Sequence, residues 1–263
     1  PRKLQGILPS VEDLTAQMSG LSTQDHDEPQ LLHIIHNAHT DDIHCLKKLS
    51  DGTFVSGSKD NCLYKWNTKG ELVKIVDEIE PTNQRDANWI TALEVMNDAY
   101  FVSGARHGQL LLWKTNGDFV KELKAKLPRP NDHVSLPLNK RRITCLAAGT
   151  NSHKPSIFVG LPTMFDSFNL IEGRTESAVK VHPNDWVYAI KPLTDTSVLT
   201  VIGTTIEVWN QKDDSWVHGG QLMPEQKKYY TTIDGKKRQQ RPFISDVLAL
   251  DAQNSQFAVA SFD

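Results

Sequence analysis

Short apolar runs separated by turn residues dominate the chain from residue 31 onward. The first four runs occupy residues 43–49, 53–57, 62–66 and 72–76. The dipeptides between them are typical of turns: Asp51-Gly52, Lys59-Asp60 and Lys69-Gly70. Runs of this length between such turns predict consecutive β-hairpins. No apolar stripe with a helical period follows residue 31, so we expect few helices.

This four-strand unit recurs along the chain. The first run of each unit begins with a β-branched residue and carries a second aliphatic residue three positions later. These runs begin at Ile43, Ile90, Ile143, Val187 and Ile244, 44–57 residues apart. One such unit cannot bury both of its faces, whereas radially stacked units can, which explains the nearly continuous apolar runs. We therefore predict an all-β fold, a β-propeller of four-stranded antiparallel blades.

The first unit resembles a WD40 repeat. It contains Ala38-His39, the segment Ser56-Gly57-Ser58-Lys59-Asp60, and Trp66-Asn67. The corresponding pattern in the WD40 family is Gly-His, Ser-Gly-Ser-x-Asp and Trp-Asp. The resemblance implies a hydrogen-bonded structural tetrad within the blade, made of His39, Ser56 (or Ser58), Asp60 and Trp66.

The later units depart from this pattern. The second has His107 in place of the turn Asp and Asn88-Trp89 in place of the His, so we expect its tetrad to be absent. The third has Phe165 or Phe168 where the Trp is expected, and the fourth has Gly203 in place of the turn Asp.

The resemblance divides the chain into two regions. Residues 31–263 are expected to form the propeller, with four complete blades and a fifth that stops after two strands. Because such rings contain about six to eight blades, we expect the propeller to be incomplete at the C-terminus of this chain. Residues 1–30 are expected to form an extension with a short helix at 11–18 and a polar linker.

Composition narrows the functional classes. The chain has 29 Lys+Arg against 32 Asp+Glu, which excludes a basic surface over the whole chain. The three cysteines form no C-x-x-C pair, and this favours a reducing compartment, the cytoplasm or the nucleus. No apolar run approaches the roughly 18 residues of a membrane-spanning helix.

The motifs of catalysis and metal binding are missing from the sequence. It contains no Gly-x-Ser-x-Gly, no Gly-x-Gly-x-x-Gly and no phosphate-binding loop. Four histidines cluster at positions 33, 36, 39 and 44, but strand alternation directs His33 and His36 to opposite faces. We therefore predict no enzyme activity, no metal and no cofactor. The alternative is a propeller-scaffold enzyme with its site in the central funnel.

One face of the predicted propeller carries aromatic and basic residues. The residue before each first strand should surround the central opening, beside the turns between second and third strands. The predicted partner-binding residues are Lys59, Trp89, Arg106, Arg142, Trp186 and Phe243. Such residues are typical of binding hot spots. The alternative is that the tryptophans only cap the core between blades.

A second basic region lies within residues 223–242. Its cations are Lys227, Lys228, Lys236, Lys237, Arg238 and Arg241. Three interpretations remain open: a solvated surface hairpin, a site for an acidic partner, phosphate or nucleic acid, and a nuclear localisation signal.

Fold alone does not fix function. We expect a non-catalytic protein–protein interaction scaffold or recognition module within a larger complex. The WD40 resemblance implies roles such as a ubiquitin-ligase substrate receptor or a signalling or trafficking platform. The expected partners are proteins or peptide motifs, including acidic or phosphorylated ones. The rival hypothesis is nucleic-acid or phospho-ligand binding through the basic loops.

Overall fold

The computed structural model describes residues 34–78, 88–123, 141–151, 155–171, 174–181, 186–203, 205–213, 215–222, 229–233, 236–240, 243–251 and 256–262. From residue 222 onward only the backbone strands are described. All of these strands lie in one compact unit, His36–Asp263. The helix and linker predicted within residues 1–30 lie outside the described residues.

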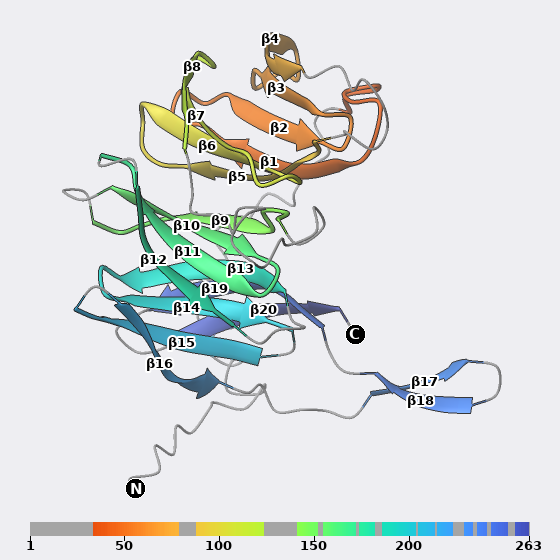
Figure 1. The fold of residues 1–263 in the computed structure, drawn as a ribbon. Coiled ribbons are helices and arrows are strands. Elements are labelled where there is room, and N and C mark those ends of the chain that lie inside the picture. The colour runs from red at the N-terminus through yellow and green to blue at the C-terminus, as the bar shows by residue number, and fades with distance from the viewer. Residues whose placement is uncertain are drawn as a thin grey trace, which may run out of the picture. The chain divides into compact units, whose positions relative to one another are not determined.

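Four sheets are antiparallel meanders in which strands consecutive in sequence are neighbours (Figure 1). Blade one contains β1 (Ile43–Lys48), β2 (Phe54–Ser58), β3 (Cys62–Trp66) and β4 (Leu72–Glu78). Blade two contains β5 (Ile90–Val95), β6 (Tyr100–Ala105), β7 (Leu110–Lys114) and β8 (Phe119–Glu122). Blade three contains β9 (Cys145–Ala148), β10 (Ser156–Leu161), β11 (Met164–Asn169) and β12 (Arg174–Lys180). Blade four contains β13 (Val187–Thr194), β14 (Ser197–Ile202), β15 (Thr205–Lys212) and β16 (Ser215–Leu222).

Two further pairs of strands follow blade four. One is the antiparallel hairpin of β17 (Tyr229–Ile233) and β18 (Lys236–Gln240), and the other pairs β19 (Phe243–Asp251) with β20 (Gln256–Phe262). The pair β19–β20 corresponds to the first two strands of a fifth blade. No helix occurs among the described residues. The predicted all-β architecture, four complete blades and one partial blade, is confirmed.

The apolar core lies between neighbouring sheets. The first strands of successive blades are adjacent in space: β1 to β5, β5 to β9, β9 to β13, and β13 to β19. Between blades one and two the buried side chains include Val55, Leu63, Leu93, Phe101 and Trp113. Similar clusters of buried side chains fill the interface between blades two and three and the interface between blades three and four. Strands buried on both faces need apolar residues at successive positions, as the sequence shows.

Glycine on the second strand allows each blade to approach the next one closely. A Cβ added to Gly104 would lie 2.6 Å from Cγ2 of Ile143, the residue that leads into the first strand of blade three. Gly57 has the same relationship to Ile90 of blade two. The glycine of the repeated Ser-Gly dipeptide is therefore a packing requirement between blades.

A buried lysine links blade one to blade two. Lys65 on β3 is only 5% exposed. Its Nζ donates to Oδ2 of Asp51 at 2.8 Å and to the carbonyl oxygen of Thr115, in the turn between β7 and β8, at 2.7 Å. A buried ammonium is tolerated only when its hydrogen bonds are satisfied, so this lysine depends on both blades.

Blade one differs from blade two in the exposure of one face. Leu46 lies opposite Ser56, just as Leu93 lies opposite Ser103 in the next blade. Leu93 is 3% exposed because blade one covers it, whereas Leu46 is 59% exposed. The same position in the repeat is thus a core position in blade two and a surface position in blade one.

Candidate functional site

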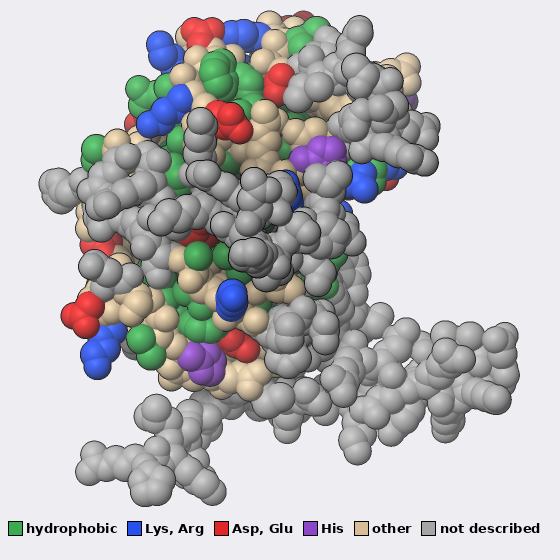
Figure 2. Space-filling view, viewed as in Figure 1, with side chains coloured by type: hydrophobic (Ala, Val, Ile, Leu, Met, Phe, Trp, Pro, Cys, Tyr) green, Lys and Arg blue, Asp and Glu red, His purple; other side chains and the backbone are tan. Residues whose placement is uncertain are grey.

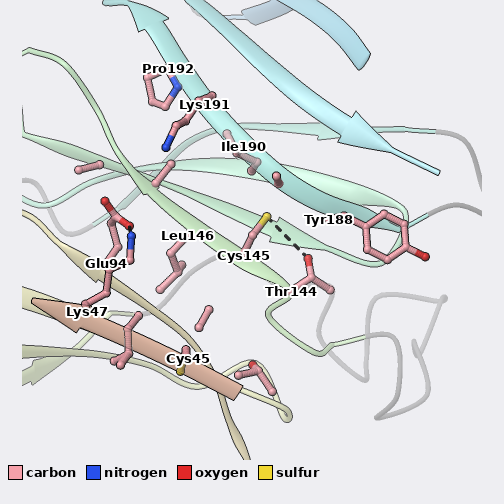
Figure 3. Close-up of a pocket in the computed structure, with 16 residues that line it drawn as sticks. Cys45, Lys47, Glu94, Thr144, Cys145, Leu146, Tyr188, Ile190, Lys191 and Pro192 are labelled. Carbon is pink, nitrogen blue, oxygen red and sulfur yellow. Dashed lines mark hydrogen bonds and ion pairs between the residues drawn. The ribbon is translucent and has the colours of Figure 1, made fainter. Parts of the chain in front are cut away.

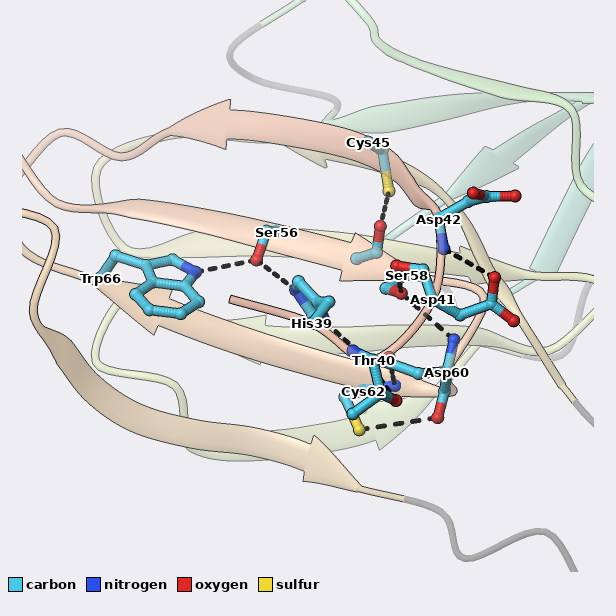
Figure 4. Close-up of polar contacts among 11 residues, drawn as sticks. His39, Thr40, Asp41, Asp42, Cys45, Ser56, Ser58, Asp60, Cys62 and Trp66 are labelled. Atoms are coloured by element: carbon cyan, nitrogen blue, oxygen red, sulfur yellow. Dashed lines mark hydrogen bonds and ion pairs between the residues drawn. The ribbon is translucent and has the colours of Figure 1, made fainter. Parts of the chain in front are cut away.

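A chain of hydrogen bonds joins the four predicted tetrad residues of blade one (Figure 4). Nε1 of Trp66 donates to Oγ of Ser56 at 2.8 Å. Nε2 of His39 lies 2.7 Å from the same oxygen, and Nδ1 of His39 lies 2.9 Å from Oδ2 of Asp60. Ser56, rather than Ser58, occupies the central position. Ser58 instead donates to the carbonyl oxygen of Asp41.

Asp60 anchors this network at the turn between β2 and β3. Its carboxylate accepts the backbone N–H groups of Thr40 and Cys62, both at 2.9 Å. Burial raises the pKa of the Asp60 carboxyl, but these two bonds and the one from His39 outweigh burial and leave the pKa below its usual value. An ionised Asp60 can only accept, so the proton lies on Nδ1 of His39, and Nε2 can accept the Ser56 hydroxyl proton.

The order Ser56–His39–Asp60 resembles a hydrolase triad in its hydrogen bonds alone. The Ser56 residue is 2% exposed and its oxygen is already bonded to the indole of Trp66. A nucleophile needs access to a substrate carbonyl and a free oxygen lone pair for attack. This geometry supports a structural role for the network rather than a catalytic one.

Other blades retain parts of the network. Nε1 of Trp113 donates to Ser103 at 2.9 Å in blade two, and Nε1 of Trp209 donates to Thr200 at 2.9 Å in blade four. Blade two was expected to lack the tetrad and in fact retains the indole-to-hydroxyl bond. In blade three, Phe168 lies opposite Ile157, the place that Trp66 takes opposite Phe54 in blade one.

Trp89 is the centre of the predicted binding face. Cζ of Arg106 lies 4.1 Å from the centroid of the Trp89 ring, and Nζ of Lys59 lies 5.4 Å from it. The backbone N–H of Arg106 donates to the carbonyl oxygen of Trp89 at 2.9 Å, which fixes the turn between β6 and β7 against the residue before β5. All three residues are half-buried.

Arg142 and Trp186 extend this arrangement to the next blade boundaries. Cζ of Arg142 lies 6.0 Å from the centroid of the Trp186 ring, which retains 36% exposure. Burial lowers the pKa of Arg142, and the charge of Arg106 lowers it further. Five of the six predicted binding residues therefore have described contacts on one side of the blades. We call Lys59, Trp89, Arg106, Arg142 and Trp186 the Trp89 face.

His44 lies in the same region, although it was not among the predicted binding residues. Its ring centroid lies 6.0 Å from that of Trp89. Burial lowers the pKa of His44, and the nearby Arg142 charge adds to this effect. The repeat could have indicated this position. His44 is the second residue of the first strand in blade one, where blade two has Thr91.

The remaining predicted residues are only partly described. Phe243 begins β19, and its side chain lies outside the description. Lys236, Lys237 and Arg238 lie on β18, whose backbone forms the hairpin that the sequence allowed as one interpretation. Lys227, Lys228 and Arg241 lie outside the described residues. Among the residues coloured in Figure 2, basic and acidic side chains are interspersed on the visible face.

The first strands of blades one to four line a cavity of about 410 Å³ (Figure 3). Its one carboxylate is Glu94, and Oε2 of Glu94 is paired with Nζ of Lys47 at 2.7 Å. Burial raises the pKa of the Cys45 thiol in its wall to about 12, so this thiol is protonated at neutral pH. Within this lining, the Cys45 thiol is therefore not a thiolate nucleophile, and Glu94 is held in an ion pair.

No group of three or more His, Cys, Asp or Glu side chains with metal-binding geometry occurs in the described part of the chain. No helix there is long and apolar enough to cross a membrane.

Comparison with known proteins identifies the fold. No protein-family model and no curated protein matches the chain. Solved structures do resemble it. One is U3-55K, with a TM-score of 0.52 and 18% sequence identity, covering 70% of this chain and 55% of that chain. Another is the WD40 repeats of RRP9, with a TM-score of 0.52 and 18% identity, covering 68% of this chain and 51% of that one.

The fold is therefore that of a WD40-type β-propeller, as the resemblance of blade one implied. The chain spans about half the length of these solved structures. At 18% identity the likeness establishes the fold alone, and function must be argued from the described surface.

Proposed function

We propose that the chain is a non-catalytic recognition module that binds a protein partner through the Trp89 face, as part of a larger complex in the cytoplasm or nucleus. The expected ligand is an acidic or phosphorylated segment of that partner. The observation that carries this proposal is the stacking of Arg106 on Trp89 at 4.1 Å.

Stacking matters because it pre-orients a cation without consuming its hydrogen bonds. A guanidinium that lies on an aromatic ring still directs its N–H donors outward in its own plane. Tryptophan and arginine are also the residues most enriched at binding hot spots, where an aromatic surface supplies buried area and a cation supplies specificity. The Trp89 face combines both on rigid strand ends.

Affinity purification with mass spectrometry tests the proposal. The wild-type chain is compared with the double variant Trp89→Ala/Trp186→Ala. Phe119→Ala/Val217→Ala is the matched control, because both residues are exposed apolar side chains on outer strands, 55% and 48% exposed. We expect the first variant to lose partners that the control retains. If the folded Trp89→Ala/Trp186→Ala protein retains every partner, the Trp89 face is not the binding surface.

Salt dependence separates this proposal from nucleic-acid binding through the basic loops. Binding driven by phosphate contacts of a nucleic acid falls steeply as the salt concentration rises, because counterions are released. A site anchored by tryptophan falls less steeply. Partner capture that survives 0.5 M salt but fails in the tryptophan variant would support the protein-binding proposal, at an ionic strength that screens exposed charges to about 4 Å.

A further inference from the structure

We propose that Arg106 and Arg142 together bind the phosphate monoester of a phosphorylated side chain in the partner protein. This inference rests on the proposed function and names the chemical group that the Trp89 face recognises. The evidence is a comparison of three neighbouring cations, Arg106, Arg142 and Lys59, which differ in whether a carboxylate compensates their charge.

Arg106 is held in position, and its charge has no ion-pair partner among the described residues. Its guanidinium lies 4.1 Å from the Trp89 ring, and its backbone N–H is bonded to Trp89, so both ends of the residue are fixed. Within the described part of the chain, no carboxylate lies within ion-pair distance of it. An ordered guanidinium loses little side-chain entropy when a ligand binds, which favours affinity.

Arg142 is a second cation without a carboxylate partner among the described residues. Its Nε is buried and has no hydrogen-bond partner among the described residues. The backbone N–H of Ile143 donates to the carbonyl oxygen of Ala105 at 3.2 Å, which brings the neighbouring Arg142 and Arg106 together, and the charge of Arg106 lowers the pKa of Arg142. Two guanidiniums that repel each other in a half-buried site are unfavourable in the free protein. A bound anion would relieve this repulsion.

Lys59, in contrast, has carboxylate partners. Its Nζ lies 3.1 Å from Oδ1 of Asp41 and 3.7 Å from Oδ2 of Asp42. Its charge is therefore compensated within blade one. The contrast assigns ligand binding to Arg106 and Arg142, and leaves Lys59 as a supporting contact of the Trp89 ring.

The charge count favours a phosphate monoester over the other anions. A phosphate monoester carries about −1.5 to −2 charges and three acceptor oxygens, enough for two guanidiniums. A carboxylate carries one charge. A nucleic acid presents one charge per phosphate, spread along an extended strand.

Degenerate peptide libraries with one fixed central residue test this inference. One library fixes phosphoserine, phosphothreonine and phosphotyrosine in equal amounts, a second fixes the unmodified residues, and a third fixes glutamate. Binding is measured for the wild type, Arg106→Gln, Arg142→Gln and Arg142→Lys. Lys69→Gln is the charge-matched control, because Lys69 lies in the exposed turn between β3 and β4.

We expect the wild type to retain the phosphorylated library alone. Each Arg→Gln variant should lose roughly tenfold or more in retention, which corresponds to the loss of a charged hydrogen bond. Arg142→Lys should lose part of it, because lysine lacks the planar fork. Lys69→Gln should bind as the wild type does. Equal retention of the glutamate library, or displacement of the phosphopeptides by a single-stranded oligonucleotide at equal phosphate concentration, would overturn the inference.

Two further readouts separate a binding role from a structural one. Arg142 has no carboxylate partner among the described residues, so Arg142→Gln should leave the melting temperature unchanged or raise it, whereas a clear fall would indicate a structural arginine. Phosphatase treatment of the lysate should abolish the partner capture that depends on the tryptophans. If capture persists after that treatment, the phosphate inference fails while the proposed function stands.

Discussion

Ile143 occupies the space that a side chain on Gly104 would need. A Cβ at Gly104 would lie 2.6 Å from Cγ2 and 3.1 Å from Cβ of Ile143, closer than side chains pack in proteins. Ile143 is 1% exposed and belongs to the core between blades two and three, so moving it would disturb that core. The contact joins the second strand of blade two to the start of blade three.

Replacing Gly104 with alanine should therefore destabilise the protein. We expect a loss of about 1–3 kcal/mol in the free energy of unfolding, the usual cost of overpacking a core. Urea unfolding measures this loss. In the double variant Gly104→Ala/Ile143→Ala, the two effects should be less than additive, because the truncated isoleucine leaves room for the new methyl group. Additive effects would show that the contact is not the cause.

Asp60 should stabilise blade one, and its contribution should depend on pH. Its pKa lies below the ordinary 3.8, so the folded state holds its carboxylate ionised where the unfolded state binds a proton. The contribution is therefore complete above the unfolded value and is lost as the pH falls through the folded value. Asp60→Asn should reduce the slope of stability against pH below about 4.

At neutral pH, Asp60→Ala should cost on the order of 1–3 kcal/mol, because it leaves His39 and the N–H groups of Thr40 and Cys62 without their acceptor. The melting temperature reports this loss. A melting temperature equal to that of the wild type would show that the hydrogen-bond network of blade one does not stabilise the protein.

Cys45 should resist alkylation in the folded protein. With a pKa of about 12, less than about one thiol in 10⁴ is ionised at pH 7.5, and the thiolate is the reactive species. Iodoacetamide labelling followed by peptide mass spectrometry should show modification of Cys45 only after the protein is unfolded in urea. Rapid labelling of Cys45 in the native protein would contradict its burial.

Leu46 and Leu93 form a matched pair that separates a blade interface from a free face. Leu93→Ala should cost about 2–5 kcal/mol, the range for a buried leucine, because Leu93 is 3% exposed. Leu46→Ala should cost less than about 1 kcal/mol, because Leu46 is already 59% exposed. Urea unfolding of both variants makes the comparison. Equal losses would show that Leu46 is covered in solution.

The repeated architecture could be predicted because short sequence patterns mark its strands and turns. Turn dipeptides and β-branched strand starts recur at each blade, and the register follows from the apolar pattern. The position of the third-blade aromatic could not be predicted in this way. Phe165 and Phe168 are both apolar and three residues apart, and the short turn at Pro162 and Thr163 sets which of them lies opposite Ile157.

The candidate site was predicted as a set of positions, and its electrostatics were not. The location of Trp89, Arg106 and Arg142 follows from the blade repeat. The compensation of Lys59 by Asp41 and the absence of any such pairing for Arg142 among the described residues depend on side-chain directions. Sequence spacing does not specify those directions, because several rotamers of a long side chain fit the same turn.

The Lys65 link between the first two blades has a mechanical consequence. Its ammonium is held by Asp51 of its own blade and by the Thr115 carbonyl of the next. Pulling blade one away would break the bond to Thr115 and leave the buried ammonium with Asp51 alone. Under a stretching force, the first two blades should therefore rupture together as one event, at a higher force than a boundary held by apolar contacts alone.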